Sequence, residues 1–190
     1  MAAFRVFLTQ ATGFYLTLIH KLRHRYALES LDAVVMPKLA LSLEMMDDFS
    51  NTGFSENALQ QNATIPSNYD QRALDVVQKI LISLGDMARY REANANKHEK
   101  NWHLAERFYR LALVIAPHNG NALNQLAVLS AFGGWSSLHA INLYLHSLSV
   151  RKISTSAINN LTLLLKKPKS EDTFFVHLTA ALAPLFLDQK

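Results

Sequence analysis

The chain has 190 residues, and 49% of them are apolar, which excludes a disordered polypeptide and is enough to bury a core. Nineteen basic residues against fifteen acidic ones give a formal net charge of +4, a mild excess that permits a polyanionic partner without requiring one. The absence of cysteine excludes disulfides and thiolate metal ligands. Polar residues interrupt every apolar run before it reaches the ~20 residues that span a bilayer, so no membrane partner is predicted.

The first predicted element is a helix from about Ala3 to Leu28. Its apolar residues follow the spacing of three and four that lays one stripe along a helix: Phe4, Phe7, Leu8, Ala11, Phe14, Tyr15, Leu18, Ile19, Leu22 and Tyr26. Lys21, Arg23 and Arg25 cluster at its end, where they favour the negative pole of the helix dipole. Transit peptides spread their basic residues and are rich in serine, so an organelle-targeting segment is disfavoured.

A second helix, a long loop and a third helix follow. The second helix is predicted from Pro37 to about Phe49, because proline suits the first helical turn. Residues 50–70 are polar and show no lasting period, which predicts a mobile loop. The third helix begins near Tyr69, where apolar residues return at helical spacing.

Small residues recur at set distances in the centre of the chain, and their spacing predicts a helical repeat. Taking Pro117 as the proline that closes one 34-residue helix-turn-helix unit places small or aromatic residues at the expected positions. These are Ala105, Tyr109 and Ala112 in one unit, and Ala127, Ala140 and Tyr144 in the next. Two helices cross closely only where side chains are short, so Gly85 is predicted to meet Ala105, and Ala127 to meet Ala140.

The same spacing predicts where the chain departs from the repeat. A regular unit separates its two small positions by about 12 residues. Gly85 and Ala105 are 20 residues apart, so we assign the extra residues of the first unit to a polar loop insertion over 92–101. Ala127 and Ala140 are 13 residues apart, and the extra residue coincides with a helix stop at residues 133–134.

The C-terminal part ends the helical pattern. A basic break over 166–170 precedes a final predicted helix over 171–187. Every apolar segment of the chain has helical spacing, and none alternates over the length of a strand. The predicted fold class is therefore all-α, with antiparallel helix pairs of tetratricopeptide type stacked as in an α-solenoid, and residues 1–190 are predicted to form a single domain.

The sequence offers little for catalysis, a metal or a cofactor. His20 and His24 have the i, i+4 spacing that places two imidazoles on one helix face, but no His-Glu-x-x-His string or nearby carboxylate pair completes a site. No nucleophile elbow and no glycine-rich phosphate loop occurs. We therefore predict no catalytic residues, no metal and no cofactor.

The most informative string for function is LGDMARYR, residues 84–91. Asp86 and Arg89 are three residues apart and share a helix face, where the carboxylate can hold the guanidinium in place. An arginine positioned by an acid, with the hydroxyl of Tyr90 beside it, can clamp a phosphate monoester. The alternative is a surface ion pair worth under about 1 kcal/mol.

Four segments resemble the SMG-class adaptors of nonsense-mediated mRNA decay, a family related to the Ever Shorter Telomeres subunit of telomerase: LISLGDMARYR, AERFYRLALVIAPHNG, ALNQLAVLS and INLYLHSLSV. The resemblance covers about Phe4 to Lys167. It implies a 14-3-3-like domain built on tetratricopeptide-type helices. It also implies phosphopeptide binding, with Arg89 contacting the phosphoserine and with Tyr90 and Asp86 beside it.

Two departures from the family limit what the resemblance implies. The family's domain begins with further helices, one of which supplies a lysine to the same phosphate, whereas this chain begins at what resembles the fourth helix. The family's downstream helical region and nuclease-like domain are not matched either, so no nuclease activity is implied.

Three functions remain open. The first is a non-enzymatic decay adaptor, cytoplasmic or shuttling to the nucleus, that binds a phosphorylated protein of the decay machinery or a sister SMG-class adaptor. The second is a module for single-stranded nucleic acid, RNA or telomeric DNA, although the basic residues are scattered over different elements. The third is a helical scaffold that has lost its phosphate clamp. For the first, Arg89→Glu is expected to abolish phosphopeptide binding and to leave the melting temperature nearly unchanged.

Overall fold

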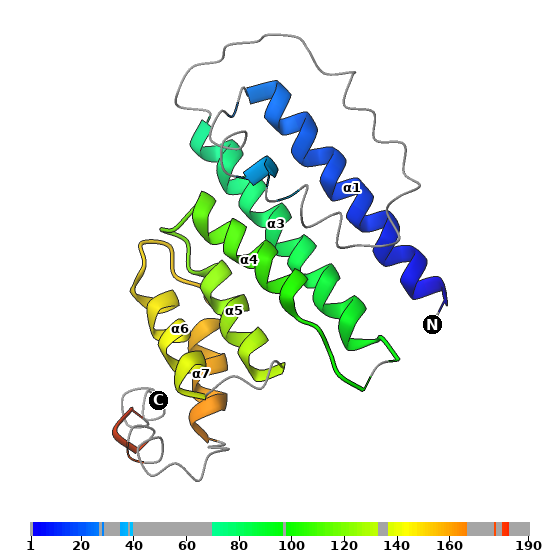
Figure 1. Cartoon of the computed structure of the whole chain (residues 1–190). Coiled ribbons are helices and arrows are strands. Elements are labelled where there is room, and N and C mark those ends of the chain that lie inside the picture. Colours follow the sequence, from blue (N-terminus) through cyan, green and yellow to red (C-terminus); the bar gives the residue numbers. More distant parts are fainter. Residues whose placement is uncertain are drawn as a thin grey trace. The chain divides into compact units, whose positions relative to one another are not determined.

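The computed structural model is built from α-helices (Figure 1). It describes residues 2–26, 28, 35–37, 39, 70–96, 98–132, 137–166, 177 and 180–182. Among these residues there is no strand, and one isolated parallel bridge joins Asn119 and Lys152. The all-α prediction is confirmed. Contacts divide the chain into two compact units, which we call unit 1 (Met1–Ala116) and unit 2 (Pro117–Lys190); the single domain expected over 1–190 stays a prediction.

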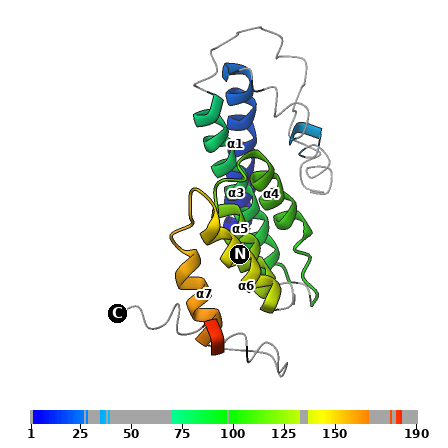
Figure 2. The same cartoon turned by 90° about the vertical axis from the view of Figure 1, so that its left-hand side faces the viewer.

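The described residues of unit 1 include the helices α1 (Ala2–Tyr26), α3 (Asp70–Ala93) and α4 (His103–Ile115). Helix α3 contacts both α1 and α4 and runs antiparallel to each of them (Figures 1 and 2). The first and third predicted helices therefore form close to their predicted bounds. The helix predicted over 37–49 and the mobile loop predicted over 50–70 lie outside the described residues, except for residues 37, 39 and 70.

The apolar stripe predicted along α1 is only partly covered. Its buried side chains recur every three or four residues and include Leu8, Leu16 and Ile19. Phe7 and Phe14, which the sequence placed on the same stripe, stay 57% and 63% exposed. A stripe of three-and-four spacing is wider than the face that one neighbouring helix covers. In α3 the buried apolar side chains recur at the same spacing and contribute to the core of unit 1: Ala73, Val77, Ile80, Leu81, Leu84 and Ala88.

Two polar contacts link parts of unit 1 that are distant in sequence. The Nη2 of Arg91 lies 3.4 Å from the hydroxyl of Thr9, which joins the end of α3 to α1. The side chain of Gln78, fully buried, donates from Nε2 to the carbonyl oxygen of Ala116 at 3.2 Å. The carbonyl groups at the end of a helix have no partner within the helix. The bond from Gln78 therefore satisfies the carbonyl group of Ala116, the residue directly after α4.

The loop insertion predicted over 92–101 lies between α3 and α4, but its first two residues form the last turn of α3. The backbone N–H of Asn101 donates to the Glu92 carboxylate at 2.7 Å, and the Asn101 side chain accepts from the N–H of His103 at 3.0 Å. A further bond joins the Lys100 amino group to the carbonyl of Ala95. Asn101 therefore ties the loop back to α3 and satisfies a donor at the start of α4.

Unit 2 contains α5 (Asn121–Phe132), α6 (Ser137–Ser149) and α7 (Ala157–Lys166). Helix α6 contacts both α5 and α7. Their buried residues form one cluster: Ala127, Ala140, Ile141, Tyr144, Ala157, Leu161 and Leu165. The glycine pair at 133–134 and the final helix predicted over 171–187 lie outside the described residues, except for residues 177 and 180–182. No described helix is both long and apolar enough to cross a membrane.

Gly120 lies where the start of α5 meets the end of α6. The hydroxyl of Ser147 donates to its carbonyl oxygen at 2.8 Å, and its own N–H donates to the carbonyl oxygen of Lys152 at 2.8 Å. A β-carbon at position 120 would lie 2.3 Å from the backbone oxygen of Ser147. Only glycine allows the two helix ends to approach this closely.

Candidate functional site

Gly85 lies in α3 and faces α4. A β-carbon built there would lie 2.3 Å from Cε1 of Tyr109, and its three nearest atoms all belong to that ring. The sequence predicted a contact with Ala105, which is buried on α4 one turn before Tyr109. Gly85 therefore does mark a close helix crossing, but the group that it accommodates is the ring of Tyr109.

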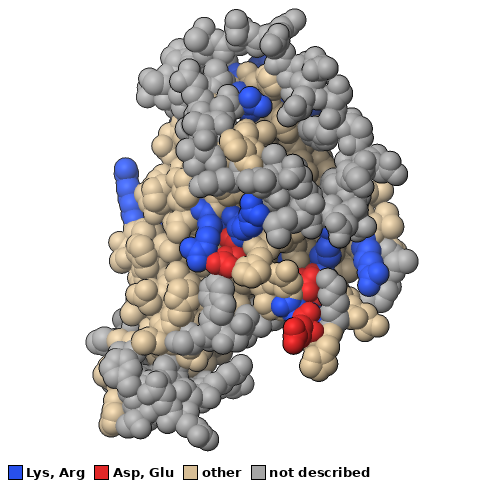
Figure 3. Space-filling view, in the orientation of Figure 1, with Lys and Arg blue, Asp and Glu red and all other residues tan. Residues whose placement is uncertain are grey.

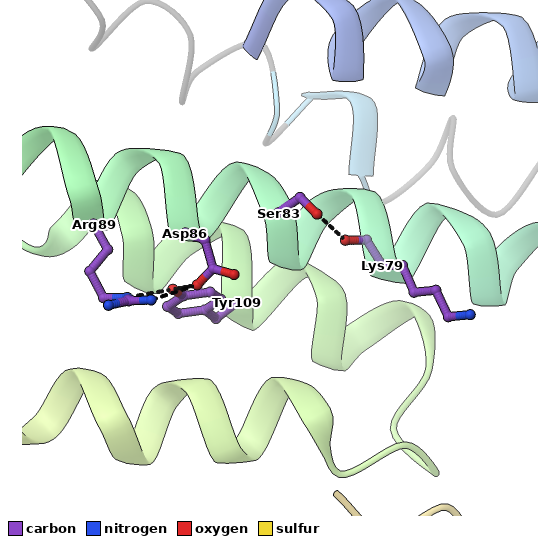
Figure 4. Close-up of polar contacts among 5 residues, drawn as sticks. All are labelled: Lys79, Ser83, Asp86, Arg89 and Tyr109. Carbon is purple, nitrogen blue, oxygen red and sulfur yellow. Dashed lines mark hydrogen bonds and ion pairs between the residues drawn. The ribbon is translucent and has the colours of Figure 1, made fainter. Parts of the chain in front are cut away.

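Three side chains beside this crossing form a closed set of hydrogen bonds, which we call the Asp86–Arg89–Tyr109 triangle (Figure 4). The Nη2 of Arg89 donates to Asp86 Oδ1 at 2.9 Å, and its Nε donates to the Tyr109 hydroxyl at 3.2 Å. The same hydroxyl donates to Asp86 Oδ1 at 2.8 Å. Two residues of α3 and one of α4 thus hold each other, and the Asp86–Arg89 pair predicted from their spacing is confirmed.

Tyr90 holds the guanidinium from another side. The Cζ of Arg89 lies 4.5 Å from the centroid of the Tyr90 ring, a distance at which a cation is attracted to an aromatic face. The Tyr90 side chain is 42% exposed. The sequence assigned Tyr90 a hydroxyl beside the phosphate, and the structure shows its ring stacked on Arg89.

The triangle is shielded from water more than a surface ion pair would be. The side chain of Arg89 is 12% exposed and that of Asp86 is 24% exposed. Hydrogen bonds to charged groups contribute about 1.5 to 3 kcal/mol when they are largely removed from water. The expectation that Arg89→Glu leaves the melting temperature unchanged needs correction, because that change would set two carboxylates against each other in a partly buried place.

The pKa values of the triangle follow from its contacts. Burial lowers the pKa of Arg89, but the hydrogen bonds to Tyr109 and Asp86 offset it and raise the pKa above its ordinary value. Burial, and then the negative charge of Asp86, raise the pKa of Tyr109 above its ordinary value. Arg89 is therefore charged, and Tyr109 is a neutral donor, over the physiological pH range.

Burial also raises the pKa of Tyr144 in α6, to about 12. In the unfolded chain a tyrosine titrates near pH 10, so below about pH 10 the hydroxyl is neutral in both states and its contribution to stability is fully present. Between pH 10 and 12 the unfolded chain loses the proton first, so the free energy of unfolding should fall, by up to about 3 kcal/mol for Tyr144. Urea unfolding followed by circular dichroism at pH 9 and at pH 11 to 12 measures this loss. Tyr144→Phe should reduce the loss, and an equal loss in wild type and variant would contradict the assignment.

Lys79 does not supply a second cation to the site. Lys79 leaves α3 on the same side as Asp86 and Arg89, but its amino group points away from the triangle (Figure 4). Ser83, between them in sequence, donates its hydroxyl to the carbonyl of Lys79 at 3.1 Å and stays within the helix. Among the described residues no group of three or more His, Cys, Asp or Glu side chains could hold a metal ion, so none is completed around His20 and His24.

The other residues predicted from the repeat are buried where helices pack. Ala105 is 2% exposed, and Ala127 and Ala140 share the core cluster of unit 2. What sequence reasoning missed is the role of Tyr109 in the candidate site, because it entered only as an aromatic repeat position. Gly85 is the signal that could have identified Tyr109, because a glycine at a close helix crossing leaves room for a large side chain on the facing helix.

Two family models match consecutive parts of the chain. The model for telomerase activating protein Est1 matches residues 1–95, and the model for the Est1 DNA/RNA binding domain matches residues 105–174. The first of these includes Asp86 and Arg89, and the second includes Tyr109.

Curated relatives carry related names. The chain is 30% identical over 171 residues to "Nonsense-mediated mRNA decay factor SMG7-like" of Arabidopsis thaliana, 90% of this chain and 15% of that protein. It is 27% identical over 165 residues to SMG5 of Danio rerio, 87% of this chain and 14% of that protein. A third relative is telomerase-binding protein EST1A of Danio rerio, 35% identical over 97 residues, 51% of this chain and 6% of that protein. The chain thus spans at most about a sixth of the length of these relatives.

Among solved structures, the chain is similar to one from the Caenorhabditis elegans SMG5-SMG7 complex, with a TM-score of 0.54 and 19% sequence identity over 70% of this chain and 33% of that chain. At this identity the likeness bears on the fold, and it confirms the predicted 14-3-3-like arrangement of helices. Together with the Est1 models over both parts of the chain, it confirms the resemblance drawn from the sequence. The chain belongs to the SMG/EST1 family of nonsense-mediated mRNA decay adaptors and telomerase-associated proteins.

Proposed function

We propose that this chain is a non-enzymatic adaptor domain that binds a phosphorylated segment of a protein of the decay machinery, with Arg89 as the phosphate-binding residue. The observation that carries the proposal is the guanidinium itself, which Asp86, Tyr109 and the ring of Tyr90 hold in one orientation. A guanidinium with a fixed fork of donors suits the oxygens of a phosphate. The family to which the chain belongs supports a place in nonsense-mediated mRNA decay. We propose in addition that the protein is cytoplasmic and shuttles to the nucleus.

The charges at the site favour a doubly charged ligand. Asp86 already compensates the charge of Arg89 at 2.9 Å, so a carboxylate with one negative charge gains little there. A phosphomonoester carries close to two negative charges at neutral pH and gains more. We therefore expect weak binding of the phosphopeptide, with a Kd of about 10 µM to 1 mM, and no measurable binding when the phosphoserine is replaced by aspartate.

Fluorescence anisotropy tests the proposal. A labelled peptide is selected on the chain from a degenerate library with a fixed central phosphoserine, and it is compared with the same peptide carrying serine or aspartate. Arg89→Lys should weaken binding of the phosphopeptide about tenfold or more, because lysine keeps the charge but loses the planar fork of donors.

Arg110→Lys is the matched control for this substitution. Arg110 lies on α4, is 60% exposed and pairs with Glu106 at 2.7 Å, outside the triangle. The control should bind the phosphopeptide as wild type does. Equal binding of the phosphorylated and unphosphorylated peptides, or wild-type affinity in Arg89→Lys, would refute a phosphate site at Arg89.

A sister adaptor is the second kind of partner that we propose. The similar solved chain comes from a complex of SMG5 with SMG7, which is an assembly of two adaptors of this family. Analytical ultracentrifugation of the 190-residue chain mixed with the matching domain of an SMG5 or SMG7 relative tests this partner. Sedimentation of the two chains as separate species at 50 µM would contradict it.

Single-stranded nucleic acid remains the alternative ligand, favoured by the charge of one part of the chain. No acidic residue occurs between Glu106 and Glu171, where seven lysines and arginines do. The model for the Est1 DNA/RNA binding domain covers the same part, residues 105–174. On the face seen in Figure 3, however, Lys and Arg side chains stand at several separate places, and acidic side chains stand beside two of these groups.

A salt titration separates the two ligands. Binding to nucleic acid releases one counterion for each neutralised phosphate, so its affinity should fall by orders of magnitude between 50 and 200 mM salt if many phosphates are contacted. One phosphoserine at one arginine should give a shallow dependence. A steep dependence with an RNA oligonucleotide, together with no discrimination between phosphorylated and unphosphorylated peptides, would favour the alternative.

A further inference from the structure

Helix packing explains the ring of Tyr109 but not its hydroxyl group. The repeat asks for an aromatic ring at this position, and the space left by Gly85 is filled by ring carbons, so phenylalanine would pack equally well. The tyrosine is fully buried, and burying a hydroxyl costs free energy unless it is hydrogen-bonded. Here the hydroxyl both accepts from Arg89 Nε at 3.2 Å and donates to Asp86 Oδ1 at 2.8 Å.

The bond between Arg89 Nε and the Tyr109 hydroxyl adds to the contacts that orient the arginine. Asp86 accepts from one Nη2 donor, and the ring of Tyr90 lies against the guanidinium. The bond from Nε to the tyrosine adds a second fixed point on the same plane. Because α4 carries the tyrosine and α3 carries the arginine, the crossing at Gly85 sets the direction in which the guanidinium points.

We infer that Tyr109 is a positioning residue of the Arg89 site: its hydroxyl locks the guanidinium against Asp86 before a ligand arrives. What Arg89 binds rests on the function proposed above, whereas the positioning itself does not. An arginine side chain that is already ordered does not lose its rotamer freedom on binding, so preorganisation increases affinity. The preorganised arginine is matched to a phosphomonoester, whose oxygens accept from donors held in one plane.

Nuclear magnetic resonance of the arginine side chains in the ligand-free 190-residue chain tests the positioning. The Nε–Hε group of Arg89 should exchange with water at least tenfold more slowly than that of Arg5, an exposed arginine of α1. In Tyr109→Phe, which keeps the ring against Gly85, this protection should be lost. Tyr144→Phe applies the same change to a buried tyrosine of unit 2 and should leave the Arg89 signal unchanged.

Anisotropy with the selected phosphopeptide tests what positioning does for binding. Tyr109→Phe should weaken binding about tenfold, equivalent to about 1.4 kcal/mol. The same substitution in an Arg89→Lys background should change binding less than twofold, because lysine has no Nε donor for the hydroxyl to hold. A tyrosine that only stabilises the fold would give equal losses in both backgrounds.

Three results would overturn the inference. They are an Arg89 Hε in wild type that exchanges as fast as that of Arg5, an Arg89 signal that is unchanged in Tyr109→Phe, and equal losses of affinity in the two backgrounds. If circular dichroism shows that Tyr109→Phe does not fold, two other measurements test the positioning: the exchange rates in wild type, and the Arg89 exchange rate in Asp86→Asn, which keeps the shape of the side chain. If wild type binds both peptides equally, the proposed function fails, and the exchange rates still decide the positioning.

Discussion

Gly120→Ala is expected to destabilise unit 2 by about 3 kcal/mol, because the added methyl group meets backbone that has little room to move. The β-carbon would lie 2.3 Å from the backbone oxygen of Ser147 and 2.8 Å from its hydroxyl. Moving α6 away would also break the bond from the Ser147 hydroxyl to the Gly120 carbonyl. It would strain the two backbone bonds that join Lys152 to Gly120 and His118. Gly120 directly precedes α5, at a capping position where alanine is less favourable than glycine, so helix propensity does not offset these losses.

Urea unfolding of the 190-residue chain measures this loss, and amide hydrogen exchange of α5, α6 and α7 locates it in unit 2. Gly13→Ala is the matched control, because a β-carbon at that position of α1 meets nothing within 4 Å. The control should gain about 0.5 to 1 kcal/mol through helix propensity alone. If Gly120→Ala were as stable as the control, Gly120 would not mark a contact that requires glycine.

Gly85→Ala is expected to lower the stability of unit 1 by about 2 to 3 kcal/mol and to disturb the candidate site at the same time. The β-carbon would lie 2.3 Å from Cε1 and 2.6 Å from Cδ1 of Tyr109. That ring is fully buried, so it must be pushed along α4 instead of turning into solvent. Its hydroxyl would then leave Asp86 and Arg89, and the guanidinium would lose one of its fixed points.

Two measurements separate the effects of Gly85→Ala. Chemical unfolding gives the change in stability, again with Gly13→Ala as the control. The exchange rate of the Arg89 Hε, measured well below the unfolding midpoint, reports whether the triangle is broken in chains that are still folded. Loss of stability with an intact, slowly exchanging Arg89 would show that α3 and α4 separate without moving the tyrosine hydroxyl, contrary to the close contact seen here.

The sequence alone determined the parts of this protein that depend on local spacing. Apolar residues three and four apart predicted α1 and α3 to within a few residues, because helical geometry repeats every 3.6 residues. Asp86 and Arg89 could be paired because residues three apart share a helix face. Gly85 could be identified with a close crossing because glycine inside a helix costs stability unless space requires it.

The tertiary structure alone decided which residues distant in sequence meet. Phe7 and Phe14 share the apolar pattern of Leu8, and only the position of α3 leaves the two phenylalanines exposed. Tyr109 is 20 residues from Arg89 in the sequence and bonds to it across a loop. The sequence shows the length of that loop but does not show the path that it takes. Spacing fixes the rotation of residues within one helix, whereas the partner of a hydroxyl depends on the register and rotation of α4 against α3. That register is set by the packing of whole side chains, such as the Tyr109 ring against Gly85, which no single stretch of sequence contains.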